Sequence, residues 1–157
     1  MEQHLQHGRH ELWEFISRPE NLTKITPPDM DFHILSPAEE IREMYPGLLI
    51  AYRVKPLWGI PLYWLSEITA MKEGYYFIDE QRRGPYAFWH HRHLLFDIPQ
   101  GVKMIDLVYY ELPFGILGRA SHSLFVRQRL YHIFSYRQKV LGELFGQLHG
   151  KIELTAA

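Results

Sequence analysis

The stretch ILGRASHSLFVRQRLYHIFSYRQKVLGELFGQL, residues 116–148, decides the fold of this chain. It contains no proline, and its apolar residues recur with the period of an α-helix. When about 100° is added per residue, one stripe collects these side chains: Val126, Leu130, Ile133, Phe134, Val140, Leu141, Leu144, Phe145 and Leu148. The stretch therefore predicts one long C-terminal helix that packs a single face against a core.

The residues before this helix predict an antiparallel sheet. Two short helices are expected first, at 11–17 and 21–25, and prolines follow each of them. From Asp31 onward the hydrophobic period changes to two, with strand candidates at 31–36, 48–55, 60–72, 75–83, 87–97 and 102–112. The links between them are short and rich in Gly and Pro, which favours hairpins. We expect an α+β fold in which a curved antiparallel sheet of six or seven strands wraps around the C-terminal helix.

Length and composition limit what the chain can do. The 157 residues, 46% of them hydrophobic, suit one compact domain, and no repeat or linker divides residues 1–157. The 17 Lys plus Arg are balanced by 18 Asp plus Glu, so nucleic acid is not an expected partner. The absence of cysteine excludes disulfides, thiolate zinc sites and a cysteine nucleophile. No long apolar run or signal-peptide core occurs, so we expect a cytoplasmic protein without stable membrane insertion.

Several motifs carry a resemblance to a known superfamily. They are ENLTKITP (20–27), WGIPLYW (58–64), DEQRRGPYAFWHHRH (79–93), ELPFG (111–115) and LFVRQRLYHIFSYR (124–137). Together with the order of the expected elements, they resemble a bacterial single-domain branch of the START-related SRPBCC superfamily, which includes polyketide cyclase/dehydrase-like and lipid-binding proteins. The resemblance implies a helix-grip fold, with two short helices after the first strand. Because only about seven residues precede the first helix, the completeness of that strand stays open.

Strand alternation selects the side chains that face inward. In 87–97 it places Trp89, His91 and His93 on one face, and the two flanking strands have corresponding faces. The inward set then combines aliphatic residues, Leu95, Met104, Val108 and Leu112, with Phe77, Asp79, Gln81, Trp89, His91, His93, Asp106 and Tyr110. If the three strands pair as consecutive hairpins, a polar patch lies within an apolar wall. Buried polar groups must satisfy one another, so the patch is either a structural network or a site.

Arg137 lies near the middle of the apolar helix stripe. A guanidinium in that position requires a buried carboxylate within hydrogen-bonding reach, and the candidates are Asp79, Asp106 and Glu67. Two interpretations stay open here. One is a buried ion pair that fixes the helix on the sheet, and the other is a ligand-binding role.

The chain has 10 Tyr, 9 Phe and 4 Trp, an aromatic content of 15%. Such rings fill cores, but in a small fold they also line cavities for apolar ligands. On the second interpretation Trp64, Leu130 and Phe134 complete the candidate ligand-binding set. Core packing is the alternative for each of them.

The sequence contains no established motif for a metal, a nucleotide cofactor or a serine nucleophile. His91 and His93 at alternate positions, with an acid on the next strand, are compatible with a metal ion. However, HExxH, EF-hand and fixed third-ligand patterns are absent, so the sequence predicts no metal site. It likewise lacks GxGxxG, Walker A and GxSxG, which argues against nucleotide cofactors and serine hydrolysis.

Two functional hypotheses follow. The first is a non-catalytic protein that binds a hydrophobic or amphipathic small molecule, lipid-, polyketide- or steroid-like, between sheet and C-terminal helix. The second is a cofactor-independent cyclase, dehydratase or isomerase. In it His91 or His93, oriented by Asp106, is the general base that acts on an enolisable carbonyl. No stabiliser of the reacting group is evident in the sequence, so the binding hypothesis is preferred.

Overall fold

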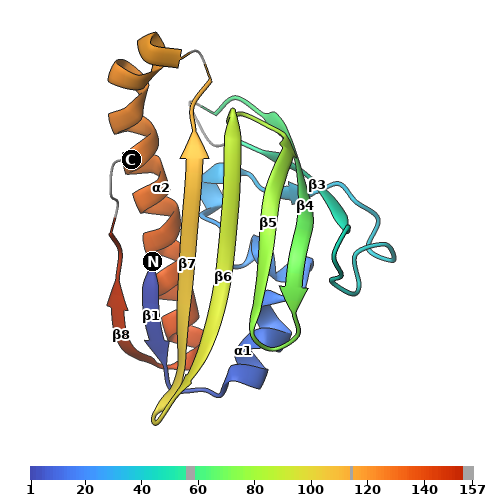
Figure 1. Ribbon diagram of the computed structural model, residues 1–157, viewed down its shortest axis with the longest axis vertical. Coiled ribbons are helices and arrows are strands. Elements are labelled where there is room, and N and C mark those ends of the chain that lie inside the picture. Colours follow the sequence, from blue (N-terminus) through green and yellow to red (C-terminus); the bar gives the residue numbers. More distant parts are fainter. Residues whose placement is uncertain (56–58, 114, 154–157) are drawn as a thin grey trace.

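One curved antiparallel sheet and a long helix make up most of the protein (Figure 1). The computed structural model describes residues 1–55, 59–113 and 115–153, without the side chains of residues 115–124. The elements are β1 (Glu2–Leu5), α1 (Arg9–Ile16), η1 (Pro19–Thr23), η2 (Pro28–Met30), β2 (His33–Ile34), β3 (Leu49–Val54), β4 (Leu62–Lys72), β5 (Tyr76–Arg83), β6 (Phe88–Ile98), β7 (Gly101–Glu111), α2 (Gly115–Phe145) and β8 (Gln147–Lys151). The helices η1 and η2 are 3-10 helices.

The sheet contains eight strands in the order β2-β3-β4-β5-β6-β7-β1-β8. The strands from β2 to β7 are neighbours in chain order, which is the meander that the sequence predicts, and short links join β4 to β5, β5 to β6 and β6 to β7. The first strand exists but is short, and it pairs with β7 on one side and with β8 on the other. The strand β8 is an addition to the expected six or seven. Its sequence, QLHGK, has no hydrophobic alternation that would have predicted a strand.

The β6–β7 hairpin depends on a glycine. Gly101 has a φ of +144°, and a Cβ at this position would collide with the backbone carbonyl oxygen of Leu5. The close approach lets β1 pair alongside β7, with Leu5 opposite Val102. Gly101 therefore serves both the turn and the docking of the first strand.

The core lies between the concave side of the sheet, α2 and the short helices. Leu5, Leu12, Val102 and Leu141 have no exposed surface, and Met104 is 1% exposed. A second cluster packs α2 against β6, and it is formed by Trp89 of β6 and by Val126, Leu130 and Phe134 of α2. The predicted helix stripe therefore faces the sheet over most of its described length.

The end of α2 differs from the prediction. The helix was expected over 116–148 but ends at Phe145, because Gly146 adopts a φ of +73° and the chain turns into β8. Leu144 and Leu148 were expected in the buried stripe and are 47% and 39% exposed. Leu148 belongs to β8. At the last turn Phe145 takes the buried position, with its ring 5.4 Å from that of Phe15.

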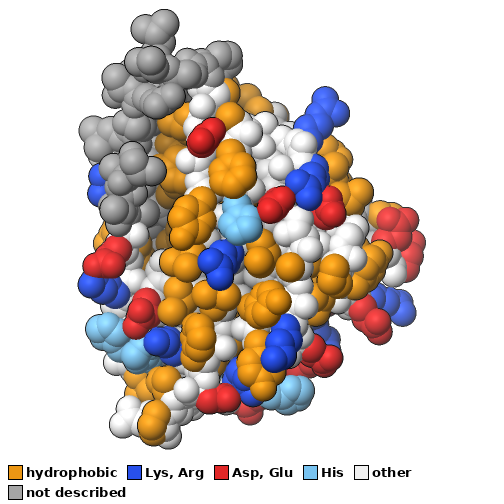
Figure 2. Space-filling model, in the orientation of Figure 1, with side chains coloured by type: hydrophobic (Ala, Val, Ile, Leu, Met, Phe, Trp, Pro, Cys, Tyr) orange, Lys and Arg blue, Asp and Glu red, His pale blue; other side chains and the backbone are white. Residues whose placement is uncertain are grey.

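Hydrophobic side chains also occur on the surface. Phe88, Phe96 and Tyr109, which alternate with the buried residues of β6 and β7, are each 46–55% exposed. In Figure 2 the orange side chains of the visible face are interspersed with charged residues and histidines. No helix in the described part of the chain is long and apolar enough to cross a membrane.

Candidate functional site

Strand register builds a polar cluster in the concave face of the sheet. Asp79 of β5 lies directly opposite His91 of β6, and His93 lies opposite Asp106 of β7. Because residues two apart on a strand share a face, all four side chains project to the same side. His91, His93 and Asp106 are buried, and the Asp79 side chain is 17% exposed. We call these four residues the His–Asp cluster.

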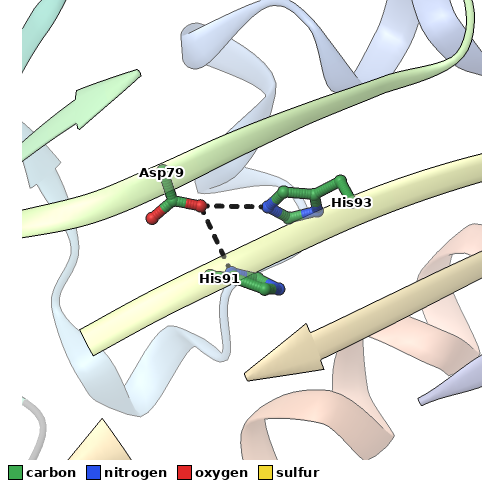
Figure 3. Close-up of side chains that lie close together, drawn as sticks. All are labelled: Asp79, His91 and His93. Carbon is green, nitrogen blue, oxygen red and sulfur yellow. Dashed lines mark hydrogen bonds and ion pairs between the residues drawn. The ribbon is translucent and has the colours of Figure 1, made fainter. Parts of the chain in front are cut away.

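The two imidazoles of the cluster lie between the two carboxylates. On one side Asp79 Oδ2 is 3.1 Å from His93 Nε2, which donates a hydrogen bond to it, and 3.4 Å from His91 Nδ1 (Figure 3). On the other side Asp106 Oδ1 is 2.7 Å from His93 Nδ1 and 3.5 Å from His91 Nε2. The histidine rings are tilted by 45° with their centroids 3.8 Å apart. Each imidazole therefore has a carboxylate at both of its nitrogens.

Arg137 of α2 completes the cluster from the helix side. Its Nη1 atom is 3.8 Å from Asp106 Oδ2, so the guanidinium pairs with a buried carboxylate beyond hydrogen-bond distance. Asp106 is thus the carboxylate that faces Arg137, but the expected hydrogen-bonding reach is not attained, and Glu67 pairs instead with Arg82. The Arg137 guanidinium also lies 5.4 Å from the Phe134 ring. Helix and sheet are thus joined by an ion pair in the interior.

Electrostatic contacts within the cluster shift the pKa values of three groups. Burial alone would raise the pKa of Asp79 and Asp106, but the neighbouring imidazoles, and for Asp106 also Arg137, lower both below 3.8. Burial alone would lower the pKa of His93, yet the Asp106 and Asp79 carboxylates raise it above 6.5. The interior therefore favours two carboxylates together with a protonated His93.

These shifts predict a bell-shaped dependence of stability on pH, measured by urea unfolding with EDTA present. The groups with shifted pKa values are Asp79, His93 and Asp106, and the side chains of His91 and Arg137 face them. The lowered carboxyl pKa values stabilise the fold above pH 3.8, and this is lost as the pH falls through the folded-state values. The raised pKa of His93 stabilises the fold below pH 6.5, and this is lost as the pH rises through its folded value.

The cluster's contribution should therefore be largest between about pH 4 and pH 6.5. His93→Phe should remove the alkaline decline. The matched control is His90→Phe, on the opposite face of the same strand, where the imidazole pairs with Glu80 at 2.9 Å. An alkaline decline that persists in His93→Phe would contradict the assignment.

A cavity of about 160 Å³ lies beside the cluster, between the sheet, the short helices and α2. Eight of the twelve predicted site residues line it: Trp64, Phe77, Asp79, Trp89, His91, His93, Leu130 and Arg137. Among the described residues the rest of the wall is mostly apolar and includes Ile25, Met30, Ile50 and Tyr52. Burial raises the pKa of Tyr52, so its phenol stays neutral. The cavity lining is therefore mainly apolar, with Asp79, His91, His93 and Arg137 as its main polar group and Thr26, Ser66 and Arg129 as further polar residues.

Four predicted site residues lie outside the cavity lining. Asp106 stands behind the histidines, and Phe134 packs against Trp89 in the second core cluster. Tyr110 packs on the ring of Tyr86 at 5.6 Å. Gln81 faces a turn: its Nε2 donates to the Tyr86 carbonyl at 2.7 Å and its Oε1 accepts from the Tyr86 N–H at 3.2 Å. Gln81 lies opposite Ser66, next to a register shift between β4 and β5, and its side chain holds this turn instead of lining the cavity.

The sequence-based search also missed part of the cavity wall. Ile50, Tyr52 and Val54 alternate along β3 as buried residues, and the same alternation argument would have found them. The residues of η1, η2 and their links, such as Pro19, Leu22 and Met30, lack a simple period. Only the folded chain brings them over the open side of the sheet.

Comparison with known proteins supports the fold through structure alone. No known family profile and no curated protein matches the sequence. TTHA0849 from Thermus thermophilus superposes with a TM-score of 0.68 at 15% identity, covering 91% of this chain and 92% of that protein. CV1439 from Chromobacterium violaceum superposes with a TM-score of 0.67 at 14% identity, covering 92% of this chain and 94% of that protein. Ara h 8.0201, a helix-grip protein, superposes with a TM-score of 0.61 at 17% identity, covering 90% of this chain and 95% of that protein.

The chain has a helix-grip fold. The meander, the short helices after the first strand and the long C-terminal helix are shared with these structures over nine tenths of the chain. At 14–17% identity the likeness extends to the fold and not to a ligand or an activity. The function therefore has to be argued from the site itself.

Proposed function

We propose that this protein binds a hydrophobic or amphipathic small molecule in the cavity between the sheet and α2, with the polar end of the ligand at the His–Asp cluster. The observation that carries the proposal is the position of the cluster. Asp79, His91 and His93 line an otherwise largely apolar cavity. Buried ionisable groups beside an apolar pocket are a common arrangement for orienting a ligand.

The cavity volume limits what it can hold. An apolar cavity of about 150 Å³ accommodates benzene, and pockets for drug-sized ligands measure about 300–1,000 Å³. At about 160 Å³ this cavity matches one or two rings. A lipid-, polyketide- or steroid-like ligand would place its polar ring or head here and its remainder toward the short helices. It would have to displace residues such as Leu22 or Met30, which line that side.

The test compares two probes of nearly equal shape, naphthalene and 2-naphthol, by fluorescence titration after native mass spectrometry has checked for co-purifying molecules. The hydroxyl of 2-naphthol should gain one hydrogen bond at the cluster, worth about 0.5–1.5 kcal/mol, so it should bind about 2–12-fold tighter. His93→Phe should abolish this difference while leaving naphthalene binding in place. His90→Phe is the matched control and should keep it.

Two results would overturn the proposal. One is the absence of binding of both probes to folded protein. The other is turnover of an enolisable carbonyl compound that falls by about 10²–10⁴-fold in His93→Phe while binding is retained. The second result would establish the acid–base enzyme, a role compatible with an imidazole held between two carboxylates at the cavity wall.

A further inference from the structure

The sequence lacks a third metal ligand at a fixed spacing from His91 and His93, but strand pairing supplies one. Asp79 comes from the neighbouring strand and lies directly opposite His91. One ligand atom from each of Asp79, His91 and His93 lies within 4.8 Å of the others. Within the part of the chain that the structure describes, no other group of three His or acidic side chains converges in this way.

We propose that Asp79, His91 and His93 bind one divalent transition-metal ion, with a coordination position that opens into the cavity. This goes beyond the proposed function and does not depend on it. The metal is bound by the protein alone, whether or not an organic ligand enters. The predicted absence of a metal site rested on sequence motifs, which do not register ligands brought together by strand pairing.

The spacing of the ligand atoms suits an ion. Bonds from zinc to imidazole nitrogen or carboxylate oxygen measure about 2.0–2.2 Å, and at angles of about 90–109° neighbouring ligand atoms are then about 3.0–3.5 Å apart. Asp79 Oδ2 lies 3.1 Å from His93 Nε2 and 3.4 Å from His91 Nδ1 (Figure 3). Both separations fall in this range without movement of the strands, and the proton that His93 Nε2 donates to Asp79 is released when the ion binds.

Asp106 supplies the outer support that metal-binding histidines usually have. It contacts the ring nitrogens that do not face Asp79, at 2.7 Å from His93 Nδ1 and 3.5 Å from His91 Nε2. A carboxylate on the far nitrogen orients the imidazole and makes it a better ligand. Arg137 Nη1, 3.8 Å from the other Asp106 oxygen, in turn opposes the negative charge of Asp106.

The donor set selects the class of ion. Two imidazoles and one carboxylate suit zinc, iron and related transition metals, whereas magnesium and calcium prefer oxygen ligands throughout. All three residues also line the cavity, and three protein ligands leave at least one position for water or a ligand oxygen. The proposed ion would therefore sit where the polar end of a cavity ligand is expected.

The experiment titrates chelator-treated full-length protein with Zn²⁺ by calorimetry and with Co²⁺ by visible absorption. We expect one equivalent to bind with a Kd below about 10 μM, a free energy of at least about 7 kcal/mol. Asp79→Asn, which preserves the shape of the side chain, should weaken binding by at least 100-fold. Asp106→Asn should weaken it by about 10–100-fold, because it acts through the histidines.

Controls separate this site from the other histidines. His90→Phe, which removes the imidazole facing Glu80 on the outer surface, should leave the affinity unchanged. Imidazole ¹⁵N spectra of the wild-type protein give a readout that needs no variant: on Zn²⁺ addition the ring nitrogens of His91 and His93 should shift at one equivalent.

Folded wild-type protein without one-equivalent binding would overturn the inference. So would an unchanged affinity in folded Asp79→Asn, or imidazole shifts confined to histidines other than His91 and His93. The binding of 2-naphthol to the metal-free protein is measured separately. Failure of the metal site and failure of the ligand site are therefore distinguishable.

Discussion

Asp106→Leu should lower the free energy of unfolding by about 3–5 kcal/mol, because it leaves a buried cation without its carboxylate. The Asp106 side chain has no exposed surface. It contacts His93 at 2.7 Å and Arg137 at 3.8 Å. Urea unfolding followed by circular dichroism measures the loss at pH 6, where the carboxylate is ionised.

The double variant Asp106→Leu/Arg137→Met should recover most of that loss. A buried ion pair costs desolvation of both charges, and apolar residues of similar volume commonly replace such a pair with little net change. The Arg137 side chain is 9% exposed and lies against Phe134, so a methionine can occupy much of its space. The stability of the double variant should therefore exceed that of Asp106→Leu alone.

A surface pair on the same helix provides the control. Lys139 and Glu143 are 3.8 Å apart with side chains 72% and 63% exposed, so Glu143→Gln should not change stability measurably. A double variant that is no more stable than Asp106→Leu would show that Asp106 matters through the histidines alone. The ion pair would then have no part in joining helix and sheet.

Much of the site could be predicted because strand alternation is a local property. The side chains of Trp89, His91, His93 and Asp106 face inward as the sequence predicts, since each strand keeps its period of two. Arg137 was identifiable as a buried charge for a similar reason, because it falls within an apolar helix stripe. In both cases a single element carries the information.

The rest of the site depends on contacts between elements. That Asp79 lies opposite His91 is a matter of strand register, which the sequence of β5 does not specify by itself. Gln81 keeps the expected alternation but is drawn into hydrogen bonds with the Tyr86 backbone. The cavity wall from η1 and η2 has no period at all. These features required the assembled fold.

The end of α2 yields the second large effect. Leu141 and Leu144 have the same side chain in the same helix, and the sequence pattern places both in the buried stripe. In the structure Leu141 has no exposed surface, whereas Leu144 is 47% exposed. Leu141→Ala should therefore cost about 2–5 kcal/mol, since it removes buried methyl groups and leaves a cavity in a tightly packed region.

Leu144→Ala should cost less than about 1 kcal/mol, because little of its surface is removed from water and alanine is the better helix former. Thermal and urea unfolding of the two variants under identical conditions gives the comparison, with unchanged urea m-values confirming that the unfolded states are equivalent. Equal losses would mean that Leu144 also packs against the core and that the helix keeps its stripe to the end. A large difference would confirm that the buried stripe no longer includes Leu144 at the last turn of α2, where the Phe145 ring packs against Phe15 and His7.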